Sequence, residues 1–274
     1  MAPPDLLLIT WNRKHYLEKT IVHLLKQDQD FRLYCWDNAS EDGTADIINS
    51  INDPRVVKKV FSKENVKQRA PSLWFLDNAT SDVVGKIDDD ILLHENWINI
   101  ILPLIRNNPI YGMLGCWIFM ESDWDEELAK HKIIDIDGQL LLPNISIAGQ
   151  SFLARKEVLK KYIKPDGYGF PINQGEMAFD GYINGYPLPI LFSRNMDEPR
   201  SPYYFDSTGF GTHGPLTARV RGFKTTAEYV DWIEQDAKAQ LIVPLQKQIQ
   251  NYKQSVSPSF HHRAKRKLLR LLQR

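Results

Sequence analysis

The stretch Val83–Trp97, with the sequence VVGKIDDDILLHENW, decides the fold prediction. It opens with an apolar run typical of a buried β-strand, continues with Asp88, Asp89 and Asp90, and leads into a helical pattern. Three neighbouring carboxylates repel one another, and removing them from water is costly unless a positive charge compensates. Two interpretations are open: a cation binds the aspartates, or they form a solvated turn that caps the next helix.

Strand and helix patterns alternate on both sides of this stretch. Because strand–helix alternation favours a mostly parallel sheet with helices on both faces, we expect an α/β fold. Ligands of such sheets bind at the carboxyl ends of the strands, where Asp37 and the aspartate triplet fall. The expected strands lie at 5–11, 31–38, 56–62 and 83–87, and the expected helices at 16–27, 40–51, 70–80 and 96–108.

The second half of the chain is less regular. We expect Gly-rich loops at 164–175 and 203–216. The other expected elements are a strand at 111–120, a hairpin turning at Asp137-Gly138, a strand running into a helix over 149–162, one short helix over 176–186, and a long helix over 225–252 kinked at Pro244.

Composition excludes few functions. The 274 residues hold 34 basic and 34 acidic side chains, so net charge favours neither nucleic acid nor membrane. Cys35 and Cys116 lie in apolar runs and predict buried free thiols in a reducing compartment. The sequence has no apolar run of about 18 residues and no basic segment before its first apolar run, so we expect a cytoplasmic protein without a signal peptide.

The basic charge is concentrated at the C-terminal end. Residues 258–274 carry six basic and no acidic side chains, with leucines at 268, 269, 271 and 272. Such a segment is typical of a basic amphipathic helix on an anionic membrane surface, here the inner face. Contact with nucleic-acid phosphates, packing on the domain or another subunit, and a disordered end are the alternatives.

Two further stretches carry a family resemblance. LLLITWNR (6–13) and FRLYCWDNASEDGT (31–44) resemble the opening of family 2 glycosyltransferases, in which Thr-Tyr-Asn-Arg follows a first strand and Asp-Asn-x-Ser-x-Asp-Gly-Thr follows a second. Trp11 replaces the usual tyrosine, and the aspartate triplet stands where that family has its DxD motif. AGQSFLARKEVL (148–159) resembles the strand and helix that follow, so the resemblance covers about residues 5–215.

The resemblance implies a GT-A fold, a Rossmann-like and mostly parallel mixed sheet, and transfer of a sugar from a nucleotide donor with inversion. It divides the chain into a catalytic domain (1–218), whose halves bind nucleotide-sugar (1–110) and acceptor (111–218), and a C-terminal helical extension (219–274). UDP- or dTDP-sugars are the favoured donors, and a glycan, polysaccharide or lipid-linked hydroxyl is the favoured acceptor. A nucleic-acid-modifying sugar transferase and a non-catalytic nucleotide-binding module are the alternatives.

The resemblance also assigns the site residues one by one. Asp37 corresponds to the carboxylate that accepts the N3–H of uracil or thymine, and Asp88 and Asp90 correspond to the outer positions of DxD. Because alternate residues of a strand point the same way, these two would hold one Mn²⁺ or Mg²⁺ while the nucleotide supplies further ligands. Asp89 then points to the ribose. The nucleotide cleft would also be lined by Thr10, Asn12, Arg13 and Arg69.

Two parts of the mechanism have weaker matches. His213, on a Gly-rich loop, corresponds to a histidine that ligates the metal or contacts phosphate in the family. The family often places an acidic pair about a dozen residues before a Gly-Tyr, and here that position holds Asn173-Gln174. Glu176 and Asp180 are the nearby carboxylates, so either is a candidate for the base that deprotonates the acceptor.

Overall fold

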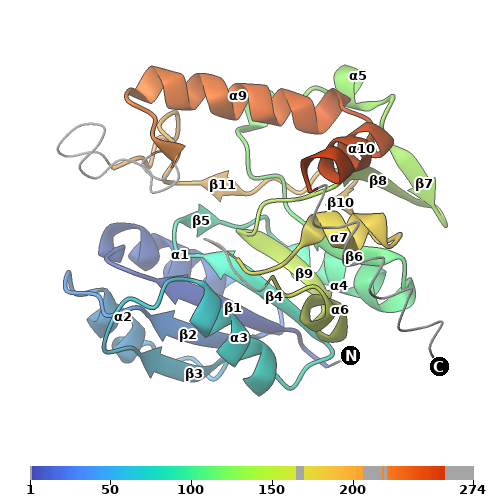
Figure 1. The fold of residues 1–274 in the computed structure, drawn as a ribbon. Helices are drawn as coiled ribbons and strands as arrows, with labels where there is room; N and C mark the ends of the chain where they lie inside the picture. Colours follow the sequence, from blue (N-terminus) through green and yellow to red (C-terminus); the bar gives the residue numbers. More distant parts are fainter. Residues whose placement is uncertain (1, 165–169, 206–217, 219–220, 257–274) are drawn as a thin grey trace.

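The computed structural model describes residues 2–164, 170–205, 218 and 221–256. A nine-stranded sheet runs through the molecule in the order β3-β2-β1-β4-β9-β6-β10-β8-β7, and β5 and β11 form a separate two-stranded ladder (Figure 1). The strands are β1 (Asp5–Thr10), β2 (Arg32–Asp37), β3 (Val56–Phe61), β4 (Val83–Asp88), β5 (Ile91–Leu92), β6 (Tyr111–Gly115), β7 (Ile134–Ile136), β8 (Gln139–Asn144), β9 (Ser151–Arg155), β10 (Ile183–Pro187) and β11 (Arg194–Asn195).

Helices connect most of these strands. They are α1 (Lys14–Lys26), α2 (Thr44–Ser50), α3 (Arg69–Asn78), α4 (Trp97–Asn107), α5 (Glu126–Ala129), α6 (Lys156–Lys161), α7 (Gln174–Phe179), α9 (Thr226–Ile242) and α10 (Leu245–Ser255), with a 3₁₀ turn η1 (Glu121–Asp123). Strands β3, β2, β1 and β4 form a parallel group in this order, and β6 is parallel to β10. Strand β9 is antiparallel between β4 and β6, so the expected mixed, mostly parallel sheet is confirmed.

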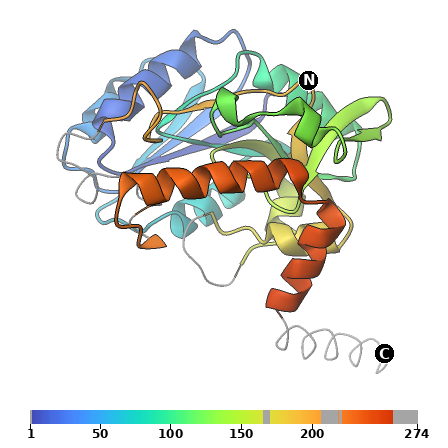
Figure 2. The ribbon, with the colours of Figure 1, turned by 90° about the horizontal axis from the view of Figure 1, so that it is seen from above.

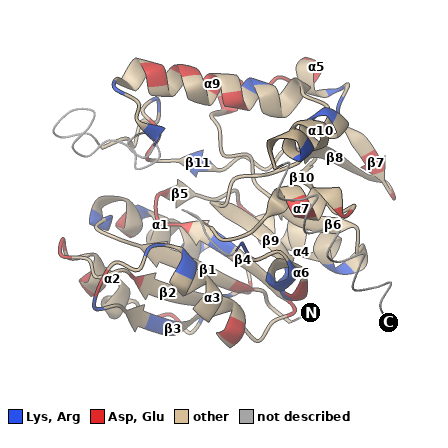
Figure 3. Ribbon diagram, viewed as in Figure 1, with Lys and Arg blue, Asp and Glu red and all other residues tan. Residues whose placement is uncertain are grey.

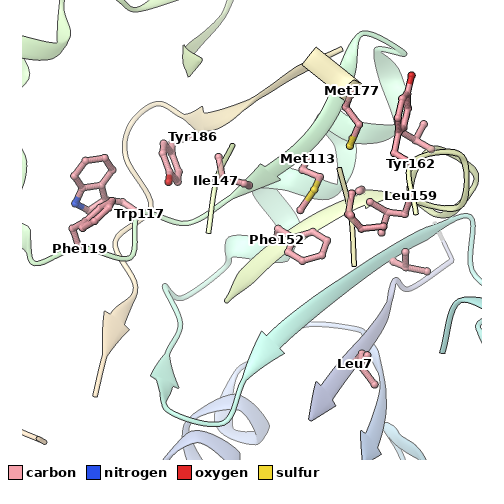
Figure 4. Packing of buried hydrophobic residues seen from close by; sticks show 14 of the residues in the cluster. Leu7, Met113, Trp117, Phe119, Ile147, Phe152, Leu159, Tyr162, Met177 and Tyr186 are labelled. Atoms are coloured by element: carbon pink, nitrogen blue, oxygen red, sulfur yellow. The ribbon is translucent and has the colours of Figure 1, made fainter. Parts of the chain in front are cut away.

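Alternate residues of the central strands pack into two separate hydrophobic cores, because successive strand side chains point to opposite faces. Leu6 and Leu8 of β1 pack with the apolar faces of α1, α2 and α4. Leu7 and Ile9 pack on the other face with α3, α6, α7 and α9. Figure 4 shows part of this second core, in which Met113, Phe152 and other labelled side chains come from several elements. The predicted coverage of both faces is therefore confirmed.

Some expectations for the second half are confirmed and some are wrong. Asp137 and Gly138 both have positive φ, 54° and 85°, and close the predicted hairpin between β7 and β8. The expected helix over 176–186 is wrong, because its second part is β10. Gly185 lies so close to the Leu142 carbonyl oxygen that a Cβ would be 2.4 Å from it, so the pairing of β10 with β8 requires this glycine.

The C-terminal helices lie over one side of the sheet, where α9 contacts α5 and η1 and α10 contacts α7 and β8. Helix α9 runs across the molecule and α10 turns away from its end, as the view from above shows (Figure 2). The expected kink at Pro244 is instead a complete break, with Pro244 extended as the residue before α10. None of the described helices combines the length and apolar character that a membrane crossing needs. Cys35 and Cys116 are buried free thiols, as expected.

Candidate functional site

Three neighbouring strands end at one edge of the sheet and bring most of the predicted residues together. In the sheet register, Thr10 at the end of β1 pairs with Asp37 at the end of β2, and Ile9 pairs with Asp88 of β4. The carboxyl ends of these parallel strands thus place a buried hydroxyl and a row of carboxylates side by side. The triplet Asp88, Asp89 and Asp90 continues directly from β4.

Asp37 offers a carboxylate oxygen to this edge. The side chain is buried, and its Oδ2 accepts a hydrogen bond of 3.0 Å from the Ser40 backbone N–H. Its Oδ1 has no hydrogen-bond partner among the described residues. Buried polar atoms are almost always satisfied, so an orphaned carboxylate oxygen at a strand end points to a ligand that donates an N–H or O–H. The Asx-turn explanation accounts for only one of the two oxygens.

Asn12 shapes the loop beside Asp37. It adopts a left-handed φ of 52°, its N–H donates to Ser40 Oγ at 2.9 Å, and its Oδ1 accepts from the Glu41 N–H at 2.8 Å. These bonds join the loop after β1 to the loop after β2. Asn12 therefore lies near Asp37, and its side chain stabilises the loop conformation.

The aspartate triplet is tied to several parts of the fold. The Lys86 ammonium, fully buried on β4, contacts the Asp88 carboxylate and donates to the Gly149 carbonyl at 3.2 Å. The Asp89 carbonyl accepts from Thr20 Oγ1 at 2.9 Å. The Asp90 carbonyl accepts from the Met196 N–H at 2.7 Å. The backbone of the triplet is therefore held in place, and the solvated-turn interpretation does not fit, because Asp89 and Asp90 are buried.

Arg13 forms the second positive charge of the site. Its Nη2 donates to Asp197 Oδ2 at 2.8 Å and lies 4.0 Å from Asp90 Oδ2. Tyr16 Oη donates to the other oxygen of Asp197 at 3.2 Å. Although burial opposes its charge, the nearby carboxylates, Asp197 first, raise the pKa of the Arg13 guanidinium. Arg13 is therefore a permanent cation inside the carboxylate cluster.

The electrostatic balance of this edge is negative. Four carboxylates (Asp88, Asp89, Asp90 and Asp197) face two cations (Lys86 and Arg13), which leaves two negative charges uncompensated when all are ionised. Burial raises the pKa of Asp89 to about 6 and raises the pKa of Asp90 well above its usual range, and Arg13 only partly opposes both shifts. A cluster that cannot easily hold all of its charges is a typical property of a functional site.

A divalent cation fits this balance. Asp90 Oδ1 is buried without a hydrogen-bond partner among the described residues, and the available ligands are carboxylate oxygens, which suit Mn²⁺ and Mg²⁺. In the part of the chain that the structure describes, no three carboxylate, imidazole or thiolate side chains already converge on one point. The protein would therefore supply Asp90 with Asp88, and a bound diphosphate would supply further oxygens.

Of the remaining predicted residues, Arg69 is connected to the site through the start of α3, and His213 is not described. Arg69 begins α3 and donates to the Lys164 carbonyl at 2.8 Å, while Asn38, next to Asp37, donates to the Lys67 carbonyl at 3.0 Å. The start of α3 is thus joined to the Asp37 side of the site. His213 and the basic tail 258–274 lie outside the described residues.

The structure separates the two candidate bases. Asp180 follows α7 just before β10, at the amino edge of the sheet, and accepts from Tyr162 Oη at 2.6 Å and Lys161 Nζ at 3.2 Å. It is therefore not brought together with the aspartate triplet. Glu176 lies in the first turn of α7, and this end of the helix is bonded to Ile147, which packs beside Gly115 at the carboxyl end of β6.

The Asn173-Gln174 pair, which stands where an acidic pair was expected, has a structural role. Asn173 caps α7, with Oδ1 accepting from the Glu176 N–H at 3.2 Å. Gln174 accepts from the Ile147 N–H and donates to the Ile147 carbonyl, both at 2.8 Å. These two amides stabilise the helix start and the loop between β8 and β9, and neither can act as a base at neutral pH.

Sequence reasoning missed Lys86 and Asp197 as parts of the site. Lys86 lies two residues before Asp88 and so on the same strand face, a spacing that could have revealed the ion pair. Asp197 is 184 residues from Arg13, and no local pattern links them. Asp236, half-buried on α9, is a further acidic side chain that was not considered, and burial raises its pKa.

Comparisons with known proteins identify the family and the fold. Residues 5–163 match the family model described as glycosyl transferase family 2, which is more than half of the chain. A comparison with curated proteins found no significant match.

Several solved structures also resemble this chain in fold. The mannosyltransferase PcManGT from Pyrobaculum calidifontis, in complex with GDP-Man and Mn²⁺, is 17% identical, with a TM-score of 0.58 over 74% of this chain and 59% of that one. S. aureus TarS 1–349 in complex with UDP-GlcNAc is 16% identical, with a TM-score of 0.54 over 70% of this chain and 58% of that one. The likeness confirms the GT-A fold, and the chain spans about three fifths of the length of these structures.

Proposed function

We propose that this chain, which belongs to glycosyltransferase family 2, transfers a sugar from a nucleotide donor to a hydroxyl acceptor, with inversion and with Mn²⁺ or Mg²⁺. One observation carries the proposal: two buried carboxylate oxygens, Asp37 Oδ1 and Asp90 Oδ1, lack partners among the described residues at one sheet edge. The first suits a base N–H and the second suits a metal. The neighbours in complex with GDP-Man and Mn²⁺ and with UDP-GlcNAc support the same ligand class.

The donor side of the proposal rests on the chemistry of Asp37. A carboxylate oxygen only accepts hydrogen bonds, so it favours a base with a donor N–H. Uracil and thymine offer N3–H, as guanine offers N1–H, and among these bases the family resemblance of the Asp37 motif favours UDP- or dTDP-sugars. Thr10, Asn12 and the Arg69 end of α3 would surround the nucleotide.

The diphosphate side rests on Asp88 and Asp90. When bound, the divalent cation would stabilise the negative charge that develops on the leaving diphosphate. Lys86 orients Asp88 through their ion pair, and Arg13 adds a second fixed positive charge within 4.0 Å of Asp90. His213 stays a proposed further ligand or phosphate contact.

The acceptor hydroxyl must lose a proton as it attacks. We assign this role to Glu176, since Asp180 is already bound by Tyr162 and Lys161. A carboxylate within hydrogen-bond reach of the acceptor contributes about 10²–10⁴-fold to the rate. If Glu176 does not act, Asp236 on α9 is the next half-buried carboxylate to test.

The experiment measures donor hydrolysis and transfer from UDP- and dTDP-sugars with Mn²⁺. Glu176→Gln should keep metal-dependent nucleotide affinity and lower turnover at least about a hundredfold. Asp180→Asn is the matched control and should keep both. Asp90→Ala should abolish the effect of Mn²⁺ on nucleotide binding with the fold intact. Full activity of Glu176→Gln would contradict the base assignment, and unchanged binding by Asp90→Ala would contradict the metal assignment.

A non-catalytic nucleotide-binding module is the second candidate, because amides occupy the position of the acidic pair. Metal-dependent UDP binding without hydrolysis or transfer would favour it. The acceptor, the cytoplasmic location and contact of residues 258–274 with an inner membrane face or with nucleic acid stay predictions.

A further inference from the structure

We propose that Asp197 is a positioning residue of the metal site: it holds the Arg13 guanidinium away from Asp90, so that Asp90 stays available to a divalent cation. The inference rests on the proposed function and goes beyond it. It assigns a role to a residue after β11, outside the region that matches the family model.

The distances establish which carboxylate Arg13 prefers. Its Nη2 is 2.8 Å from Asp197 Oδ2, a charged hydrogen bond, and 4.0 Å from Asp90 Oδ2, the outer limit of an ion pair. Asp197 has a second donor, Tyr16 Oη at 3.2 Å, and is buried. Arg13 is therefore anchored on Asp197, and Asp90 keeps one oxygen without a protein partner among the described residues.

The backbone fixes this arrangement. Strand β11 pairs with β5, with Asn195 opposite Ile91 and Arg194 opposite Leu92. The next residue, Met196, donates its N–H to the Asp90 carbonyl at 2.7 Å. Asp197 follows immediately, so its position relative to Asp90 is set by the same ladder that holds the triplet.

Removing the Asp197 charge would redirect Arg13. A buried guanidinium needs a counter-ion, because desolvating an unpaired charge is strongly unfavourable. Asp88 is already paired with Lys86, so Asp90 is the nearest carboxylate left for Arg13. An Arg13–Asp90 pair would occupy the oxygens that the cation needs, and the cation would have to displace it.

The test measures UDP affinity by calorimetry with and without Mn²⁺, and takes the ratio of the two affinities as the metal effect. Asp197→Asn should reduce this ratio about tenfold or more, since a charge-assisted hydrogen bond is among the stronger interactions in proteins. The double variant Arg13→Met/Asp197→Asn should restore the ratio to within about threefold, because the competing cation is gone.

Two further variants keep the test decisive. Asp123→Asn, the matched control, removes a carboxylate from Arg200, which keeps Glu198 and Glu234 as partners, and should leave the ratio unchanged. Arg13→Met alone should not lower the ratio, because Arg13 on Asp197 supplies no ligand to the metal site, and this variant keeps the proposal open to contradiction if Asp197→Asn does not fold.

The outcomes separate the two proposals. A wild-type ratio near one would overturn the proposed metal site and, with it, this inference. If the wild-type ratio is clearly above one, three results would each overturn the role of Asp197 alone. They are an unchanged ratio in Asp197→Asn, no rescue in the double variant, and a reduced ratio in Arg13→Met.

Discussion

The two sides of the sheet hold their polar groups in opposite ways. At the carboxyl edge of β1, β2 and β4, the carboxylates of Asp88, Asp90 and Asp197 outnumber the cations that they contact. Two buried carboxylate oxygens of this edge, Asp37 Oδ1 and Asp90 Oδ1, have no hydrogen-bond partner among the described residues. Around α7 and α10, neutral amides make paired hydrogen bonds. Gln174 binds both backbone groups of Ile147, and Gln248 Oε1 accepts from the Ile145 N–H at 2.7 Å.

The difference indicates which side is built for a ligand. Satisfied amide networks stabilise one arrangement, whereas uncompensated buried charge costs stability unless a ligand completes it. Charge is also present on α9, which carries acidic and basic side chains along its length (Figure 3). Lys132 is a buried basic side chain on the amide side. Its Nζ donates to the Asn144 side chain and, at 2.6 Å, to the Gln240 carbonyl.

The largest expected effect on stability comes from removing Lys86, the buried counter-ion of Asp88. Lys86→Met leaves Asp88 without its cation, and loss of one partner of a buried pair costs about 3 kcal/mol. Lys132→Met is the matched change on the amide side. It removes an ammonium that has no carboxylate partner in the described contacts, and it should lower the free energy of unfolding by less than about 1.5 kcal/mol. Urea unfolding of both variants measures the difference, and equal losses would contradict the comparison.

A smaller effect is expected from Gln174→Ala. The Ile147 N–H and carbonyl lose their partner, and unsatisfied backbone groups cost about 2 kcal/mol together after partial exposure to water. Gln235→Ala, on an exposed position of α9, is the control and should change stability by less than about 0.5 kcal/mol. Loss of metal-dependent UDP affinity in Gln174→Ala would show that the amide side also serves the donor site, against our interpretation.

The last expected effect is a pH dependence of stability, which is the smallest of the three when it is counted per pH unit. Burial lowers the pKa of Lys132 to about 7, so the folded state releases this proton near pH 7 while the unfolded state keeps it to about pH 10.4. The unfolded state then binds more protons in that window, and stability should rise with pH by about 1 kcal/mol per unit relative to Lys132→Met. Urea midpoints of both proteins from pH 7 to pH 10 test this, and parallel curves would contradict it.

Local pattern was sufficient to predict much of the fold. Apolar strands in alternation with helices predicted the parallel sheet, and Asp37 and Asp88 were predicted at its carboxyl edge because strand polarity alone determines that position. The strand β10 was missed because its sequence, INGYP, has no strand-like alternation, and only its pairing with β6 and β8 makes it a strand.

The site was predicted less completely. The partner of Asp197, Arg13, is selected by tertiary packing and has no local signal. The Lys86–Asp88 pair is local, and its two-residue spacing on β4 was overlooked. Asp180 was proposed from proximity along the chain, whereas the path of α7 into β10 places it at the other edge of the sheet. The assignment of Glu176 stays a prediction.

The most direct test of the central claim is a calorimetric titration of UDP, dTDP, GDP and CDP, each with and without Mn²⁺. The carboxylate cluster predicts that UDP or dTDP binds at least about tenfold more tightly with the metal, because the cation compensates the two excess charges beside Asp90. No binding of any diphosphate, or an affinity that the metal does not change, would contradict the claim that this edge of the sheet is a metal–nucleotide site.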